Sequence, residues 1–344
     1  MRILIFSDLH LHEWTYAATV TKEGLNSRLA LQRDAIKIML GHRSLLNADY
    51  IVFCGDFFHK HGVVTTPVLS VASELMETLA KTFDKKEVTF LVGNHDMGDN
   101  SGKIHAIDLF KRYGRIVAPR AYKSIKFPYP MNFIGYTDKR EELVESLRKV
   151  NPGLLFMHQG ISGVPVDSGI VLKNEILSPD IIPDHIEMAF AGHYHSPKKI
   201  TEKLHVVGAP MQHTWGDKGA RGWVVYDTDT SAVERYISGD PEFISVEYKE
   251  ALNIIVGGDF IKVTDAEGDP EEVRQELLNR GAVSVEVIRK LDSPVQPAVV
   301  GQQPKVILDV INDFKKRVNK PGRFEEVGDE IMKGTYAPPT IPSI

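Results

Sequence analysis

The chain begins Met1-Arg2-Ile3-Leu4-Ile5-Phe6-Ser7-Asp8-Leu9-His10, an apolar run that ends in an acid and a histidine. Continuous apolar runs of this length are typical of strands that are buried on both faces of a sheet. In extended backbone, residues two positions apart point to the same side, so Asp8 and His10 can converge on one ion. This stretch therefore predicts a buried strand with a metal-binding pair at its carboxyl end.

Four more apolar runs further along the chain also end in polar clusters. They are residues 50–54 before Gly55-Asp56-Phe57-Phe58-His59, 88–92 before Gly93-Asn94-His95-Asp96, 154–157 before His158-Gln159-Gly160, and 188–191 before Gly192-His193-Tyr194-His195. Helical apolar patterns over 29–46 and 68–79 separate the first three runs. This β-α-β-α-β order predicts parallel strands, whose carboxyl ends hold the sites of such sheets. We therefore expect all five clusters to meet at one edge of a sheet.

The clusters supply carboxylate, amide and imidazole donors. The candidate ligands are Asp8, His10, Asp56, Asn94, His158, His193 and His195. A carboxylate has two oxygens, so Asp56 can bridge two ions. Oxygen and imidazole without thiolate suit Mn, Fe or Zn better than Ca or Mg. Each motif alone is compatible with an ordinary loop or turn, but all five in order after strands predict a centre for two divalent metal ions. Mn is the first choice, with Mg, Fe or Zn as alternatives.

Composition limits the function classes. The 344 residues are 42% hydrophobic and 25% charged, as expected for a globular protein with one large and one smaller domain. The net charge of −5 argues against a protein that coats nucleic acid by charge alone, but it does not exclude a nuclease. No apolar run approaches the roughly 20 residues that cross a bilayer. We therefore expect no membrane association and a cytoplasmic location, which is the host cytoplasm for a phage-encoded chain. The single cysteine, Cys54, excludes an internal disulfide and is expected to be buried.

The later part of the chain changes character. Runs at 204–207, 223–226 and 233–237 predict antiparallel strands in a second sheet behind the first. Strand-like runs at 253–256, 260–263 and 283–288 flank a helix that opens at Asp269-Pro270, which predicts a small α+β unit. Prolines at 293–304 predict a linker, and 306–318 predicts a helix whose apolar face needs a partner. The predicted division is 1–240 for the catalytic domain, 245–292 for a capping domain, 293–304 for the linker, and 305–344 for the helix and tail.

The five clusters, in this order, resemble the signature of the calcineurin-like metallophosphoesterases. The matching residues are Asp8-x-His10, Gly55-Asp56, Gly93-Asn94-His95-Asp96, His158 and Gly192-His193-x-His195. The resemblance implies an α/β fold in which two mixed β-sheets pack as a sandwich flanked by helices. It also implies that Asp8, His10, Asp56 and His195 hold one metal, and that Asp56, Asn94, His158 and His193 hold the other.

A closer resemblance is to the SbcD-type DNA repair nucleases and the related phage recombination nucleases. It is carried by Gly55-Asp56-Phe57-Phe58-His59, Met157-His158-Gln159, Gly208-Ala209-Pro210, Gly216-Asp217 and Arg221-Gly222-Trp223. It implies a nuclease subunit with 3′-to-5′ exonuclease and endonuclease activity in DNA repair and recombination. It further implies DNA as substrate, an SbcC-type coiled-coil ATPase bound through the C-terminal helix, and dimerisation. The same motifs permit an alternative, a phosphodiesterase or phosphatase that acts on a small phosphoester. A scaffold with a degenerate site is disfavoured by the full ligand set.

Three further side chains have expected roles beside the metals. His95 is adjacent to the ligand Asn94 and is assigned to the phosphate, as the proton donor to the leaving oxygen. Asp96 is a candidate to orient the His95 ring. By resemblance, His59 positions the substrate or His95. Six other histidines are expected to be surface or packing residues, namely His12, His42, His61, His105, His185 and His205, while His213 is a candidate to approach the site.

Overall fold

The computed structural model describes residues 1–289 except 43–46, 85–86, 127, 166–170, 173–174, 240 and 268. Its first large sheet has the strand order β14-β13-β1-β2-β3-β4. The strands are β1 Arg2–Phe6, β2 Tyr50–Phe53, β3 Val88–Leu91, β4 Arg115–Val117, β13 Gly222–Asp227 and β14 Ala232–Ile237. Strands β1 to β4 are parallel neighbours, whereas β13 pairs antiparallel with both β1 and β14.

The second large sheet has the order β11-β12-β10-β7-β6-β5. Its strands are β5 Tyr122–Ile125, β6 Met131–Ile134, β7 Gly153–His158, β10 Ile186–Gly192, β11 Lys198–Lys199 and β12 Leu204–Val206. Strands β6, β7, β10 and β12 are parallel, and β5 and β11 close the two edges antiparallel. A separate two-stranded pair joins β8 Val164–Pro165 to β9 Val171–Leu172.

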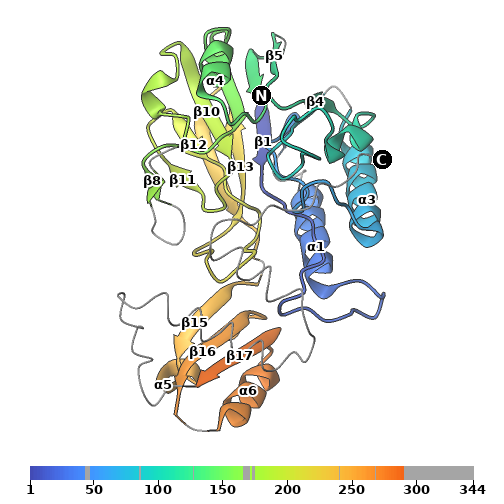
Figure 1. Ribbon diagram of the computed structural model, residues 1–344, viewed down its shortest axis with the longest axis vertical. Coiled ribbons are helices and arrows are strands. Elements are labelled where there is room, and N and C mark those ends of the chain that lie inside the picture. Colours follow the sequence, from blue (N-terminus) through green and yellow to red (C-terminus); the bar gives the residue numbers. More distant parts are fainter. Residues whose placement is uncertain are drawn as a thin grey trace, which may run out of the picture. The chain divides into compact units, whose positions relative to one another are not determined.

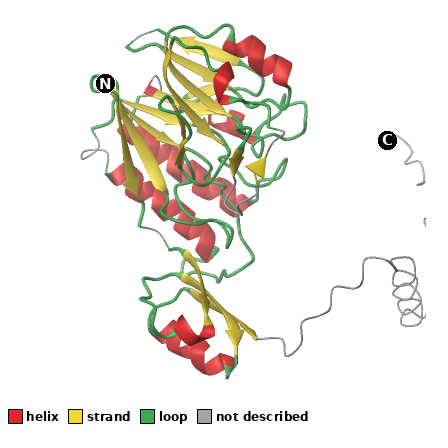
Figure 2. Ribbon diagram, turned by 90° about the vertical axis from the view of Figure 1, so that its left-hand side faces the viewer, coloured by secondary structure: helices red, strands yellow, loops and turns green. Residues whose placement is uncertain are grey.

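The two sheets pack face to face through one apolar cluster (Figure 2). Alternation along β1 shows how the sequence builds this layer: Ile3 and Ile5 lie in the cluster between the sheets, whereas Leu4 and Phe6 lie in the cluster with the helices. From the second sheet, Phe156 stacks between Phe133 and Phe190 of the neighbouring strands, with ring centroids 5.3 and 5.6 Å away. The core is therefore the interior of a β-sandwich.

Helices cover the outer faces of the sandwich (Figure 1). On one side lie α1 Ser27–Gly41 and α3 Thr66–Thr82, and on the other lies α4 Arg140–Leu147. Short 3-10 helices occupy η2 Ala106–Phe110 and η3 Pro179–Ile181. The Asn26 side chain begins α1 by accepting the amides of Arg28 and Leu29. The predicted α/β sandwich flanked by helices is confirmed.

One expectation about the sheets is wrong. The five polar clusters do not follow strands of a single sheet: β1, β2 and β3 belong to the first sheet, and β7 and β10 to the second. Likewise, β13 and β14 extend the first sheet instead of forming another one. The clusters still meet because the two sheets bring the carboxyl ends of these strands to the same end of the sandwich.

Beyond the sandwich, three parallel strands form a small sheet of order β15-β16-β17. These are β15 Phe243–Glu247, β16 Phe260–Ala266 and β17 Ser284–Arg289, joined by α5 Tyr248–Ala251 and α6 Pro270–Asn279. Ile261, Val263 and Leu277 lie in its own apolar cluster. The helix start at Asp269 is confirmed, but 253–256 is a loop. The boundaries predicted for the domains stay predictions, and the linker and C-terminal helix lie outside the described residues. Among the described helices, none combines the length and apolarity needed to cross a membrane.

Candidate metal centre

The loops after the strands hold their side chains in unusual backbone conformations. Asp8, His10, Asp56 and His193 have positive φ angles of 54°, 48°, 61° and 97°. Such conformations are uncommon for residues with a side chain, and they persist only where the surrounding structure enforces them. Here, four of the seven candidate ligands adopt this backbone region.

Glycines next to the ligands allow these loops to approach one another. A Cβ atom on Gly192 would lie 2.1 Å from Ser7 Oγ and 2.3 Å from the carbonyl oxygen of Cys54. A Cβ atom on Gly93 would lie 2.1 Å from Asp56 Oδ1. Only glycine fits at such separations, so the Gly-His and Gly-Asn steps of the sequence are requirements of packing.

The first group of donors combines Asp8, His10 and His195. One donor atom from each lies within 4.8 Å of the others. The Nε2 atoms of His10 and His195 are 3.1 Å apart, and His10 Nε2 lies 3.9 Å from Asp8 Oδ1. Asp8 and His10 are buried, and the Asp8 carboxylate also accepts the backbone amide of His193.

The second group combines Asp56, His158 and His193, again with donor atoms within 4.8 Å of one another. Asn94 belongs to it: its Oδ1 lies 3.1 Å from His158 Nε2 and 3.0 Å from His193 Nδ1. The structure thus brings all seven predicted residues together. That the two groups hold metal ions stays a prediction.

One oxygen of Asp56 faces both groups. Asp56 Oδ2 lies 3.6 Å from His10 Nε2 and 3.3 Å from His158 Nε2. The other oxygen, Oδ1, accepts the backbone amide of His95. Asp56 therefore bridges the two groups through a single oxygen, rather than through one oxygen for each group as the sequence suggested.

The donor set fits a pair of divalent cations. His158 Nδ1 lies 2.6 Å from the carbonyl oxygen of Cys54 and so donates its proton there. Its Nε2 then faces the oxygens of Asp56 and Asn94. Burial opposes the charged form of His158, yet the Asp56 carboxylate outweighs this effect and raises the pKa of His158 to about 9. The Nε2 atom of His158 and the oxygens of Asp56 and Asn94 thus converge where a cation would satisfy all three groups, and imidazoles with carboxylates suit transition-metal ions.

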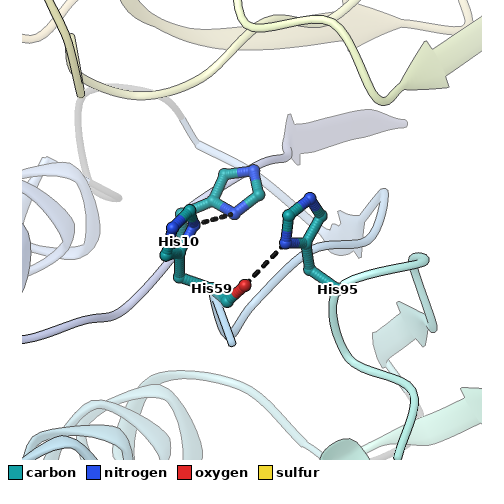
Figure 3. A group of neighbouring side chains, drawn as sticks. All are labelled: His10, His59 and His95. Atoms are coloured by element: carbon teal, nitrogen blue, oxygen red, sulfur yellow. Dashed lines mark hydrogen bonds between the residues drawn. The ribbon is translucent and has the colours of Figure 1, made fainter. Parts of the chain in front are cut away.

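His95 lies beside the first group and is held by the main chain of His59 (Figure 3). His95 Nδ1 donates to the carbonyl oxygen of His59 at 2.6 Å, which leaves Nε2 for a substrate. The His59 ring contributes differently, because its Nδ1 lies 3.3 Å from Nδ1 of His10. These three histidines form a further close group. Because the Nδ1 atom of His95 bonds to a carbonyl oxygen, this nitrogen is not available to an ion between the three rings.

Asp96 has a different role from the expected one. Its carboxylate is buried and accepts the backbone amides of Asp56, Phe58 and Gly93 at 2.9–3.0 Å. The Nδ1 of His95 bonds to His59 instead. Asp96 therefore ties the loop after β2 to the loop after β3, and it acts on the centre by fixing the backbone of Asp56.

Sequence reasoning underestimated two histidines near the centre. His213 is 1% exposed, and its Nε2 donates to the backbone oxygen of Asp8 at 2.9 Å. His61, expected at the surface, is exposed but stacks on the His95 ring at 4.7 Å between centroids. Neither histidine belongs to a recognisable motif. Only the position of His213 after Gly208-Ala209-Pro210 indicated that it could lie near the centre. Cys54 is buried, as expected.

A pocket of about 300 Å³ opens beside His193 and His195. Val164, Val206 and Tyr194 supply apolar surface, and Lys198 adds a positive charge. The pocket therefore offers room next to the candidate ligands for a group attached to a phosphate.

The family model of the calcineurin-like phosphoesterases matches residues 1–240. The chain belongs to this family. Among solved structures, it is similar to a novel archaeal phosphodiesterase at 12% identity and a TM-score of 0.36, covering 69% of this chain and 99% of that one. It is similar to Yfce, a phosphoesterase from E. coli, at 13% identity and 0.35, with the same coverage. A dimetal phosphatase from Danio rerio has 10% identity, a TM-score of 0.36, and coverage of 65% and 91%. No curated protein matches the chain.

Family membership makes the centre that of a metal-dependent phosphoesterase. Two divalent ions, when bound, polarise the phosphoryl oxygens and supply an activated water. The chain itself contributes the candidate ligands, the loops that carry them, and His95 beside the first group. These groups are positioned for hydrolysis of a phosphoester.

Proposed function

We propose that the chain is a two-metal phosphodiesterase that acts as the DNA nuclease subunit of an SbcCD-like repair and recombination complex. The observation that carries the two-metal part is the placement of Asp56 Oδ2, 3.6 Å from a nitrogen of the first group and 3.3 Å from a nitrogen of the second. A shared oxygen between two donor groups is suited to a pair of ions that clamp one phosphate. Mn is the proposed metal.

Different residues of the chain have different roles in the proposed reaction. The seven ligands fix the two cation positions, and Asp96 fixes the backbone that carries Asp56. As the doubly protonated imidazolium, His95 gives its Nε2 proton to the leaving oxygen and becomes neutral, while its Nδ1 proton stays bonded to the His59 carbonyl oxygen and holds the ring in place. His59 also supports His10 through the contact between their Nδ1 atoms.

Sequence features outside the centre favour a nuclease. In the run Gly55-Asp56-Phe57-Phe58-His59, His59 stands where the SbcD-type nucleases have a histidine. A small unit of three strands and two helices follows the residues that carry the centre. The basic residues Lys315, Lys316 and Arg317 follow in the sequence. Because the whole chain carries a net charge of −5, we propose that much of the DNA-binding surface comes from an SbcC-type ATPase partner.

A second candidate is hydrolysis of a small phosphoester by the same centre. The pocket beside His193 and His195 favours it, because about 300 Å³ is enough to admit a small organic group next to the metals. The chemistry is the same in both cases, and only the substrate differs.

Parallel assays separate the two candidates. The protein with Mn²⁺ is incubated with an end-labelled DNA duplex and, separately, with bis-p-nitrophenyl phosphate, in each case with and without the ATPase partner. The proposal expects cleavage of both substrates. Hydrolysis of the small ester without any DNA cleavage, even with the partner, would contradict the nuclease assignment and support the second candidate.

A further inference from the structure

Asp217 is a buried acid outside the predicted ligand set, and we propose that it is a positioning residue for one half of the metal centre. Asp217 sets which ring nitrogen of His195 is free to bind a metal ion. Through His213, it also holds Asp8 in place. The inference rests on the proposed function, because it takes these two residues as ligands of the same ion. It adds a residue that selectively supports the first donor group.

Both oxygens of Asp217 are engaged. The residue is 5% exposed. Its Oδ1 lies 3.2 Å from His195 Nδ1, and its Oδ2 accepts the backbone amides of His213 at 2.6 Å and Thr214 at 3.1 Å. The Asp217 side chain therefore holds both the candidate ligand His195 and the turn at residues 213–214.

The bond to His195 decides which ring nitrogen can bind a metal. An ionised carboxylate only accepts hydrogen bonds, so His195 Nδ1 must carry the proton that is donated to Asp217. The opposite nitrogen, Nε2, then has a free electron pair, and it is this nitrogen that points toward His10. Carboxylate partners of this kind orient metal-binding histidines and raise their basicity.

The second oxygen of Asp217 acts on Asp8 through His213. With its backbone held by Asp217, His213 directs Nε2 to the carbonyl oxygen of Asp8 at 2.9 Å. Asp8 needs such support because its backbone has a positive φ of 54°. The His213 ring also packs against His10 and His195, with centroids 5.4 and 5.1 Å away. Asp217 thus supports two ligands of the first group by separate routes.

The second donor group has supports of its own. His158 Nδ1 bonds to the carbonyl oxygen of Cys54, and Asp56 Oδ1 accepts the backbone amide of His95. Neither bond involves Asp217. Loss of the Asp217 carboxylate is therefore expected to weaken one metal site and leave the other in place.

The variant Asp217→Asn tests this selectivity because asparagine has one acceptor oxygen where aspartate uses two. Its oxygen is needed by the amides of His213 and Thr214, so its NH₂ group faces His195 Nδ1. That nitrogen must then accept a hydrogen bond from the NH₂ group. The ring proton therefore moves to Nε2, where it blocks metal binding. Loss of such an outer partner typically lowers metal affinity by about 10- to 100-fold.

Metal binding is measured by isothermal titration of the EDTA-stripped full chain with Mn²⁺. Wild type is expected to bind two equivalents. In Asp217→Asn, one equivalent is expected to weaken and the other to remain. The double variant Asp217→Asn/His195→Gln is expected to bind no more weakly than His195→Gln alone. The asparagine oxygen still accepts the amides of His213 and Thr214, so the route to Asp8 is kept and both changes act on His195. In the double variant Asp217→Asn/His158→Gln, in contrast, the losses in Mn²⁺ affinity are expected to add, because the two residues belong to different donor groups.

A second variant separates positioning from folding. Asp217→Ser keeps a hydroxyl oxygen that can accept a turn amide, yet it leaves His195 Nδ1 without its carboxylate, so the same selective loss is expected. Asp108→Asn, at an exposed acid paired with Lys111, is the matched control and is expected to bind like wild type. Wild-type affinity for both equivalents in both Asp217 variants would overturn the inference while leaving the proposed function intact. A wild-type chain that binds no Mn²⁺ would overturn both.

Discussion

The carbonyl oxygen of His59 lies 2.6 Å from Nδ1 of His95, so the main chain of one histidine orients the ring of the other. The ring of His59 makes other contacts: its Nδ1 lies 3.3 Å from Nδ1 of His10, and the ring stacks on that of His95. A backbone acceptor cannot be removed by changing the His59 side chain. The two histidines therefore have separable roles, which substitutions at each position can distinguish.

We predict that His95→Asn retains metal binding but loses turnover. Asparagine keeps a polar group of similar reach but cannot deliver a proton, and removal of a general acid typically costs about 10²- to 10⁴-fold. The kcat for bis-p-nitrophenyl phosphate and the Mn²⁺ stoichiometry are measured together. The exposed His185→Gln is the control and is expected to behave like wild type. A His95→Asn enzyme with normal kcat would exclude the acid role.

We predict a smaller effect for His59→Ala. The carbonyl that holds His95 remains, and only the ring contacts to His10 and His95 are lost. By analogy with other outer partners of metal ligands, activity is expected to fall about 10- to 100-fold, with Mn²⁺ affinity falling as well. The same assay compares the two variants. If His59→Ala lowers kcat as far as His95→Asn while Mn²⁺ binding stays normal, the ring of His59 itself takes part in proton transfer.

We predict that Asp96→Asn destabilises the fold of the metal-free protein. The buried carboxylate accepts three backbone amides, whereas an asparagine NH₂ group would face at least one of these donors. Leaving a buried donor without its acceptor costs about 1–3 kcal/mol. Urea denaturation in EDTA measures this free energy of unfolding. Asp99→Asn, at an exposed acid, is the control and is expected to unfold at the wild-type midpoint. An unchanged midpoint for Asp96→Asn would show that the three bonds are dispensable.

We predict that Gly192→Ala destabilises the protein and lowers its activity. The added methyl group would meet Ser7 Oγ at 2.1 Å and the carbonyl oxygen of Cys54 at 2.3 Å, so the loops that carry Asp8 and His193 must move apart. Overpacking of this kind costs about 1–3 kcal/mol. Gly41→Ala near the end of α1 is the control, because nothing lies within 4 Å of its added methyl group. Equal unfolding midpoints for the two variants would contradict the close approach.

Local patterns in the sequence predicted the strands and the polar side chains that meet at their ends, but not how the strands assemble. The strands β1, β2 and β3 lie within one residue of their predicted ends, since an apolar run followed by a polar cluster is a local signal. Pairing is not local: β13 joins β1 across more than 200 residues, so its sheet could not be read from periodicity. Residues 253–256 are apolar enough for a strand but pair with no described strand.

The same limit explains which site residues were missed. The ligands belong to short motifs with fixed spacing, whereas Asp217 reaches His195 across 22 residues and His213 reaches Asp8 across 205. An isolated acid or histidine belongs to no motif with a fixed spacing, so the sequence does not identify it as a site residue. The role of Asp96 was misjudged for a related reason, because its partners are backbone amides, which a sequence does not distinguish.

Crystals of the full chain soaked with Mn²⁺, with anomalous diffraction recorded at the Mn absorption edge, test the two-metal claim most directly. Two anomalous peaks are expected. One is bonded to Asp8, His10 and His195, the other to Asn94, His158 and His193, and both contact Asp56 Oδ2. A single peak, or none, in crystals of protein that hydrolyses bis-p-nitrophenyl phosphate would contradict it.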